Sequence, residues 1–288
     1  MRTAFLGPRG TFSEEAAIAY VGDKGELLAF STIPALTAAV ETGLANSAVL
    51  PIENSIEGPI STTLDLLIHE TPLRICAEVV VPVRMFLVTA PGAKLADIKV
   101  VASKPEAIGQ CRRFLDRCLP NVEQRAALST AAAVQEVSEG IDLAIAAIGP
   151  RRSAELYNGQ VLAHDIQDVH TNVTRFVALA NEDARPTGKD KTSIGFMVKE
   201  NVPGALYEIL ATLAEETLQL TKVESRPTKA WLGDYVFLID FEGHRVDPHV
   251  TRALSRLEER CSHLKIFGSY PQFPLDSLRS LFEPPAFP

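Results

Sequence analysis

The stretch LRICAEVVVPVRMFLVTA, from Leu73 to Ala90, is a long apolar run that Pro82 interrupts, so it predicts two consecutive strands or one bent strand. On either side of it, short apolar runs alternate with helix-length segments, for example TAFLG followed by SEEAAIAYVG. Strands that alternate with helices are typical of parallel βαβ units. Two such sets joined by one extended segment predict two lobes with a cleft between them, where ligands bind at the carboxyl ends of strands.

A second unit follows the two lobes. Its elements are expected in the order strand, helix, strand, strand, helix, strand, which is the ferredoxin-like unit. The predicted fold class is therefore α/β: a two-lobed, periplasmic-binding-protein-like domain with a cleft, followed by a ferredoxin-like βαββαβ domain. The expected boundaries are 1–182 for the two-lobed domain (lobe one about 1–75 plus 164–182, lobe two about 76–163), 183–191 for a linker, 192–271 for the βαββαβ domain and 272–288 for an irregular proline-rich tail.

Composition and charge exclude several classes of function. The 288 residues carry a formal net charge of -8, and the basic residues are scattered, so we expect no binding to nucleic acid or to an anionic membrane. The N-terminal residues do not have the pattern of a secretory signal, and no apolar run approaches the roughly 20 residues of a membrane span, so we expect a cytoplasmic protein. The four cysteines lack C-x-x-C spacing, and nucleotide, esterase and metal motifs are absent, so no cofactor or metal is expected.

Two turns of the first lobe carry clusters of polar residues. In GPRGTFSEEAA, from Gly7 to Ala17, Ser13 is the expected helix N-cap, and the alternative is that Thr11, Ser13 and the exposed amides bind an anion. In PIENSIEG the residues Asn54 and Ser55 follow a strand, where they either form a turn or supply polar contacts to a cleft.

Three further segments have both a structural and a functional interpretation. Ser103 in VASKPEAIGQC is expected to cap a helix, and STAAAVQEV has the same form. Thr174 and Arg175 precede a short apolar run, so the ordinary expectation is a backbone hydrogen bond for the threonine and a carboxylate partner for the arginine. In a dry, preorganised site, however, a threonine hydroxyl can donate to a leaving oxygen.

Taken together, these stretches resemble the prephenate dehydratase family. The matching pieces are GPRGTFSEEAA, PIENSIEG, SKPEAIGQC, TRF (174–176), GALYEIL and ESRP, which occur in the family's order and cover most of residues 4–270. The resemblance implies an enzyme that converts prephenate to phenylpyruvate, with loss of carbon dioxide and the ring hydroxyl, in L-phenylalanine biosynthesis and without a cofactor.

The resemblance also implies which residues form the site. Thr174 would be the catalytic hydroxyl, and Arg175 would either hold a substrate carboxylate or fix the start of its strand. Leu128 stands where many relatives have a polar or acidic residue. The other implied catalytic residues are Asn54, Ser103, Gln110 and Glu53, and the implied substrate-binding residues are Thr11, Ser13, Ser55, Thr130, Arg175 and Phe176.

The C-terminal unit resembles an ACT domain, a regulatory module, and the implied effector is L-phenylalanine acting by feedback inhibition. An effector site at a subunit interface implies a homodimer or homotetramer. The implied allosteric residues are Asn201, Val202, Pro203, Gly204, Ala205, Leu206, Glu224, Ser225, Arg226 and Pro227. Two alternatives to this function stay open: an arogenate dehydratase, and a non-catalytic two-lobed binding protein that senses an amino acid.

Overall fold

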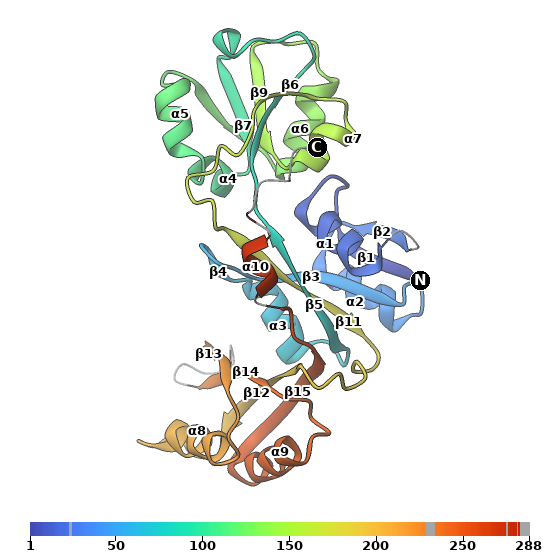
Figure 1. Ribbon diagram of the computed structural model, residues 1–288, viewed down its shortest axis with the longest axis vertical. Coiled ribbons are helices and arrows are strands. Elements are labelled where there is room, and N and C mark those ends of the chain that lie inside the picture. Colours follow the sequence, from blue (N-terminus) through green and yellow to red (C-terminus); the bar gives the residue numbers. More distant parts are fainter. Residues whose placement is uncertain (23–24, 229–233, 275, 281, 283–288) are drawn as a thin grey trace.

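The computed structural model describes residues 1–22, 25–228, 234–274, 276–280 and 282. These residues form three β-sheets that follow one another along the long axis of the molecule in Figure 1. The first two sheets belong to two α/β lobes, and the third belongs to the C-terminal unit, so the predicted two-lobed α/β fold with a further domain is confirmed.

The first sheet belongs to lobe one and has the strand order β2-β1-β3-β11-β5, with the short β4 paired to β3. Strands β1, β2 and β3 run parallel, whereas β11 is antiparallel to both β3 and β5. The sheet is therefore mixed, whereas the sequence predicted parallel strands. The antiparallel β11 comes late in the sequence and lies between β3 and the edge strand β5. The elements are β1 (Arg2–Leu6), α1 (Phe12–Val21), β2 (Glu26–Phe30), α2 (Ile33–Glu41), β3 (Ser47–Asn54), β4 (Gly58–Pro59), α3 (Ser61–His69), β5 (Arg74–Pro82) and β11 (Val173–Ala180).

The second sheet belongs to lobe two and has the order β10-β6-β9-β7-β8. Strand β7 is parallel to β8 and β9, and β6 is antiparallel to β9 and β10. Its elements are β6 (Phe86–Thr89), η2 (Leu95–Asp97), β7 (Val100–Ser103), α4 (Pro105–Gly109), α5 (Arg112–Cys118), β8 (Glu123–Ala126), α6 (Thr130–Glu139), β9 (Ile145–Gly149), α7 (Arg151–Leu156) and β10 (Gln160–Ala163).

The chain crosses between the lobes twice, through residues 83–85 and 164–172. The two crossing segments are hydrogen-bonded to each other: Val83 N–H donates to Asn172 O at 2.8 Å, and Ile166 N–H to Met85 O at 3.0 Å. The interrupted run is thus two strands, β5 and β6, which lie in different sheets. The expected start of lobe two at residue 76 is wrong, because β5 stays paired with β11 as far as Pro82.

The C-terminal unit has the predicted βαββαβ order, and its antiparallel sheet has the strand order β13-β14-β12-β15. Its elements are β12 (Asp190–Val198), α8 (Ala205–Glu215), β13 (Leu220–Pro227), β14 (Tyr235–Glu242), α9 (Pro248–Arg260) and β15 (Cys261–Pro271). The predicted linker ends earlier than expected, since the buried Asp190 and Lys191 already pair in β12. Within the predicted irregular tail, a short helix α10 (Asp276–Ser280) forms, and positions 275, 281 and 283–288 lie outside the described residues.

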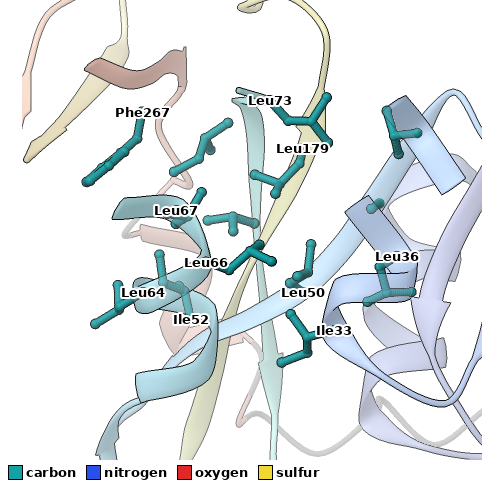
Figure 2. Packing of buried hydrophobic residues seen from close by; sticks show 14 of the residues in the cluster. Ile33, Leu36, Leu50, Ile52, Leu64, Leu66, Leu67, Leu73, Leu179 and Phe267 are labelled. Atoms are coloured by element: carbon teal, nitrogen blue, oxygen red, sulfur yellow. The ribbon is translucent and has the colours of Figure 1, made fainter. Parts of the chain in front are cut away.

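One apolar cluster joins lobe one to the C-terminal unit. Leu64 and Leu67 of α3 and Leu179 of β11 share this cluster with Phe267 of β15 (Figure 2). Buried apolar area of this kind stabilises the contact by about 25 cal/mol per Å². The C-terminal unit is therefore held against lobe one by an apolar core that both units share, in addition to the linker between them.

Gly268 is the closest point of this contact. A Cβ atom built on it would lie 2.2 Å from Ile75 O and 2.6 Å from Ile75 N, so β15 can approach β5 only without a side chain. We expect Gly268→Ala to force the two units apart and to lower the free energy of unfolding by about 1–3 kcal/mol or more. Urea unfolding would measure the loss of stability, and limited proteolysis at residues 183–189 would detect separation of the two units. The control is Gly43→Ala, because Gly43 also has a positive φ but has no atom close to the position of an added Cβ. Equal losses in the two variants would contradict the steric explanation.

Candidate active site

The pairing of β3 with β11 brings two of the predicted site residues together. In this register Thr174 lies opposite Asn54, and both residues stand where their strands meet the crossing segments. Asn54 is buried, whereas Thr174 stays partly accessible. Two residues that are 120 positions apart in the sequence thus face the same side of one sheet.

The Asn54 amide is the centre of a polar cluster. Its Nδ2 donates to Thr174 Oγ1 at 2.9 Å, to Asn172 Oδ1 at 2.9 Å and to Val173 O at 3.1 Å, and its Oδ1 accepts from the backbone N–H groups of Ile56 and Glu57. The Thr174 oxygen accepts from the Asn54 amide, so the hydroxyl proton of Thr174 points away from Asn54. Within the described part of the chain, this proton has no acceptor. The hydroxyl is therefore oriented as a hydrogen-bond donor.

Asn172 is the member of this cluster that the sequence analysis missed. It is buried, and its Oδ1 also accepts from Ser55 Oγ at 3.2 Å, while its Nδ2 donates to Gln110 Oε1 at 3.1 Å. Gln110 in turn donates to Glu57 Oε1 at 2.9 Å. Because Gln110 follows α4 in lobe two, this chain of amides bridges the lobes at the crossing segments.

A cavity of about 440 Å³ adjoins this bridge, and Asn172 and Gln110 are among the side chains on its wall. This volume falls in the range of small-molecule sites. Arg113, which is exposed, contributes a cation to a wall that also carries the carboxylates of Glu57 and Asp168. The full lining is Ile56, Glu57, Glu106, Gly109, Gln110, Arg113, Gln167, Asp168, Val169 and Asn172.

The GPRGTFSEEAA turn forms a second contact between the lobes. Ser153 Oγ of α7 donates to Gly10 O at 2.6 Å, and Arg152 Nε lies 3.3 Å from Glu14 Oε2. Burial alone would raise the pKa of Glu14, but hydrogen bonds from Gly10 N–H, Arg9 and Arg152 lower it. This carboxylate is thus held ionised between the lobes.

The residues of that turn have local structural roles. Thr11, not Ser13 as predicted, is the N-cap of α1, and its Oγ1 accepts from Glu14 N–H at 3.3 Å. Thr11-x-x-Glu14 has the capping-box sequence pattern, which is the sequence signal for the cap, but Glu14 Oε2 accepts from Gly10 N–H at 2.7 Å and not from the N–H of Thr11 itself. Ser13 is buried in the first turn of the helix.

Three other predicted site residues do not join the cluster around Asn54. Ser103 is fully buried and donates to Ile148 O at 2.5 Å; it does not cap α4, whose N-cap is Lys104. Thr130 is the first residue of α6, which Ser129 caps. Phe176 is buried in the core between α1 and the first sheet. Leu128 is 97% exposed, so its apolar side chain does not line a closed pocket.

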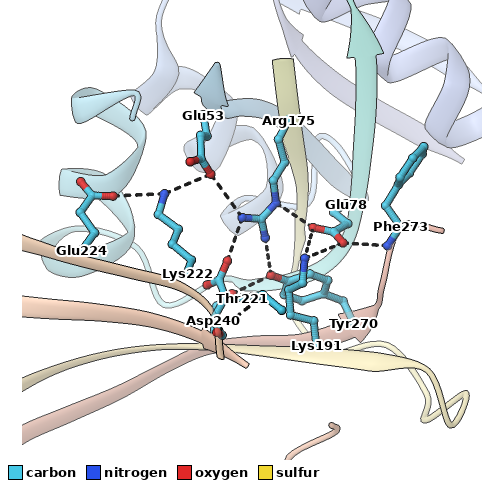
Figure 3. A network of polar contacts seen from close by, with 11 residues as sticks. Glu53, Glu78, Arg175, Lys191, Thr221, Lys222, Glu224, Asp240, Tyr270 and Phe273 are labelled. Carbon is cyan, nitrogen blue, oxygen red and sulfur yellow. Dashed lines mark hydrogen bonds and ion pairs between the residues drawn. The ribbon is translucent and has the colours of Figure 1, made fainter. Parts of the chain in front are cut away.

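Arg175 and Glu53 lie on the opposite face of the sheet from Thr174 and Asn54, because side chains alternate along a strand. Figure 3 shows Arg175 in a network that reaches the C-terminal unit: Nε donates to Glu78 Oε2 at 2.7 Å and NH1 to Asp240 Oδ2 at 2.8 Å. Glu53 belongs to the same network and accepts from Lys222 Nζ at 3.2 Å. Neither side chain reaches the cavity, so the predicted contact of Arg175 with a substrate carboxylate has no support in this geometry.

The predicted allosteric residues occupy two segments of the C-terminal unit. Residues 201–204 precede α8, whose N-cap Gly204 has a φ of 92°, and 205–206 are its first two residues. Residues 224–227 end β13. Arg226 donates to Ser61 Oγ at 3.3 Å and to Asp65 Oδ1 at 3.1 Å, both in α3 of lobe one. The ESRP segment therefore contacts lobe one directly.

The described residues contain no group of three or more His, Cys, Asp or Glu side chains arranged to hold a metal ion. Of the helices formed by these residues, none has the length and apolar character needed to cross a membrane.

Glu15, next to the lobe contact, gives stability a pH dependence. Burial raises the pKa of Glu15 to about 7, with Glu155 and Glu14 adding to the increase and Arg152 opposing it. The folded chain therefore keeps a proton that the unfolded chain loses above about pH 4.5, so this residue lowers stability progressively as the pH rises to about 7. We expect Glu15→Gln to raise the free energy of unfolding by about 2–3 kcal/mol at pH 8 and by little at pH 4.5.

Urea unfolding at several pH values would measure this difference, and Glu26→Gln is the control because Glu26 is exposed. A gain from Glu15→Gln that is the same at pH 4.5 and pH 8 would contradict the assignment, because then the effect would not depend on the titration of the carboxyl group.

Two α/β lobes, joined by two crossing segments and bridged by amides beside a cavity, define a class of cleft-forming α/β proteins. Comparisons with known proteins identify the family: the family model for prephenate dehydratase matches residues 3–184. The chain is 38% identical over 289 residues to the prephenate dehydratase of Amycolatopsis methanolica, covering 99% of this chain and 92% of the relative. The chain belongs to the prephenate dehydratase family and is an enzyme of this kind.

Two solved structures share almost the whole fold. The prephenate dehydratase of Arthrobacter aurescens in complex with L-Phe has a TM-score of 0.87 and 36% identity, covering 94% of this chain and 90% of that one. A protein described as a novel type of quorum quenching acylase, GqqA, has a TM-score of 0.86 and 30% identity, covering 96% of this chain and all of that one. Since one of these relatives is described by a different activity, the fold alone does not define the reaction.

Proposed function

We propose that the chain converts prephenate to phenylpyruvate in L-phenylalanine biosynthesis, with the reaction taking place beside Thr174 where the two lobes meet. The observation that carries the proposal is the hydrogen bond from Asn54 Nδ2 to Thr174 Oγ1, which leaves the threonine proton available to a ligand. Family membership supports the substrate, and the cavity of about 440 Å³ beside the cluster has a suitable size.

The reaction requires from the protein mainly the orientation of the substrate and one hydrogen-bond donor. As the carboxylate leaves as carbon dioxide, its bonding electrons enter the ring, and the ring hydroxyl departs with the electrons of its own bond to become water after gaining a proton. Aromatisation supplies the driving force. Thr174 would donate to the departing oxygen, and Asn54 would hold the threonine in place, because preorganised donors stabilise developing negative charge.

Arg113 would bind a carboxylate of the substrate, since it brings a cation to the wall of the cavity. We expect Arg113→Gln to raise KM about tenfold with little change in kcat, because loss of a binding contact present in both ground and transition states affects KM. Steady-state kinetics with prephenate would measure it, with the neighbouring Arg112→Gln as control, because Arg112 instead pairs with Asp116 at 3.9 Å. An equal effect of both substitutions would point to general electrostatics.

The regulatory part of the proposal concerns the C-terminal unit, which would act as an ACT domain that binds L-phenylalanine. The complex of the Arthrobacter aurescens relative with L-Phe supports this, as do the positions of GALYEIL at the start of α8 and ESRP in β13. The residues at 201–206 and 224–227 would form the effector site between two subunits of a homodimer or homotetramer. We place the enzyme in the cytoplasm, where a biosynthetic enzyme of this kind acts.

One assay tests the proposed reaction against its alternatives. Purified protein incubated with prephenate should produce phenylpyruvate, measured by the ultraviolet absorbance of its enol in alkali. Faster turnover of arogenate, judged by kcat/KM, would indicate an arogenate dehydratase. Binding of L-phenylalanine with no turnover of either compound would favour a binding protein, and hydrolysis of an amide without dehydration would favour an acylase.

A further inference from the structure

The strands that carry Thr174 and Asn54 also carry, one residue away, the side chains that face the C-terminal unit. Thr174 pairs with Asn54, and Arg175 pairs with Glu53, in the same two-stranded ladder. The first pair belongs to the amide cluster that adjoins the cavity through Asn172, and the second pair belongs to the network of Figure 3. Any movement of the second pair therefore moves the backbone that positions the first.

Arg175 is held on every branch of its guanidinium. Besides Glu78 and Asp240, its NH2 donates to Tyr270 Oη at 2.8 Å, and Glu53 lies 3.7 Å from NH1. Its side chain is only 14% exposed. Burial alone would lower the pKa of Arg175, but Tyr270, Asp240 and Glu78 raise it well above its usual value, so the cation is fixed in this position.

Three of the side chains that hold the ladder come from the C-terminal unit. Asp240 of β14 and Tyr270 of β15 bind Arg175, and Lys222 of β13 binds Glu53 at 3.2 Å. Lys222 also contacts Glu224 of the ESRP segment at 3.1 Å. The charged contacts are thus continuous from ESRP to the strand pair behind Thr174.

The ladder has a point of irregularity at this position. The register shifts between Arg175 and Phe176, so that Phe176 pairs with Pro51 while Arg175 pairs with Glu53. One residue of β3, Ile52, is therefore extra, as in a β-bulge, and bulges near active sites set the direction of neighbouring side chains. The side chains that hold Arg175 and Glu53 act beside this bulge.

We propose that Arg175 is a positioning residue that couples the C-terminal unit to the active site: Asp240, Tyr270 and Lys222 hold the Arg175–Glu53 pair, and this pair sets the Thr174–Asn54 geometry on the other face. The inference rests on the proposed function, because it takes Thr174 as the donor. An effector that shifts β13 and β14 relative to lobe one would displace the hydroxyl without touching the cavity. A ligand can bias the two arrangements only by its different affinity for them.

The test uses the full chain, because removal of the C-terminal unit would expose the shared apolar cluster and would take Asp240 and Tyr270 from Arg175 and Lys191 from Glu78. Tyr270→Phe removes one anchor of Arg175 and keeps the ring. Its control is Lys265→Met, since Lys265 binds the backbone of Thr71 in lobe one at 2.9 Å, outside the network.

The expected result is a specific change in both catalysis and inhibition. Tyr270→Phe should lower kcat severalfold with KM nearly unchanged, and should weaken inhibition by L-phenylalanine at least about fivefold, the lower range of allosteric coupling. Calorimetry should still detect L-phenylalanine binding. Lys222→Met, which releases Glu53, should weaken inhibition in the same direction, whereas Lys265→Met should behave as the wild type.

Different outcomes overturn different parts of the argument. A wild type that does not convert prephenate overturns the proposed function. A wild type that converts prephenate, with Tyr270→Phe and Lys222→Met folded, equally active and equally inhibited, overturns the coupling alone. An equal loss of inhibition in the Lys265→Met control would also overturn it, because the effect would then come from general loosening of the domain contact.

Discussion

Thr174→Val should lower kcat at least about a hundredfold while KM changes little, because the substitution removes a single preorganised donor and preserves the shape of the side chain. The fold should tolerate the change. Asn54 Nδ2 keeps Asn172 Oδ1 at 2.9 Å and Val173 O at 3.1 Å as acceptors, so no buried donor loses its last partner. A loss of activity in this variant would therefore be chemical in origin.

The measurement is the initial rate of phenylpyruvate formation at saturating prephenate, together with thermal unfolding of each variant. Thr174→Ser is the matched control, since it keeps the hydroxyl and loses only a methyl group, and it should retain most of the activity. If Thr174→Val keeps the kcat of the wild type, the hydroxyl is not the donor to the departing oxygen. If Thr174→Ser loses as much as Thr174→Val, packing of the methyl group is the important property.

Local patterns in the sequence predicted much of the fold. The alternation of apolar runs with helical segments predicted the two lobes, and the order of elements after residue 192 predicted the βαββαβ unit. Pro82 indicated the break between β5 and β6. The exact boundary of lobe one was wrong because strand pairing decides it: β5 belongs with β11, which lies about 100 residues later in the chain and has no local signal in Leu73 to Ala90.

The same difference between local and long-range information explains which site residues could be predicted from the sequence. Asn54 and Thr174 follow or begin apolar strands, so their place at a sheet end was predictable. Asn172 was missed because an asparagine in a polar run looks like any turn residue; its adjacency to TRF was the one available signal. Ser103 was interpreted as a helix cap, whereas its acceptor, Ile148 O, is 45 residues away. Local spacing cannot identify partners of that kind.

Arg175 shows the largest difference between the sequence and the structure. From the residues alone the ordinary expectation for Arg175 was a carboxylate partner, and the resemblance added two alternatives, binding of a substrate carboxylate or fixing the start of its strand. Its partners stand at positions 53, 78, 240 and 270, on four different strands. Only the fold brings those positions together, and the alternation of side chains along β11 then directs Arg175 away from the cavity.

Arg175→Met should lower the free energy of unfolding by about 3–5 kcal/mol, because it leaves the buried carboxylate of Asp240 without its ion-pair partner. Glu78 has a side chain only 2% exposed and would keep Lys191, whose Nζ donates to it at 2.9 Å, but Asp240 would lose its closest ion-pair partner. Urea unfolding would measure the loss. The control is Arg151→Met, which breaks an exposed pair with Glu155 and should cost about 1 kcal/mol or less.

The difference in the free energy of unfolding between the wild type and Arg175→Met should become smaller at acidic pH. In the wild type, burial alone would raise the pKa of Asp240, but Arg175 lowers it below its usual value, so the carboxylate stays charged. Without Arg175, burial acts with less opposition, and the carboxylate should take up a proton at a higher pH than in the unfolded chain. The variant should therefore lose stability relative to the wild type as the pH rises above about 4, and least below it. If the loss in the free energy of unfolding is the same from pH 4 to pH 8, the variant is destabilised by lost packing and not by the unpaired charge of Asp240.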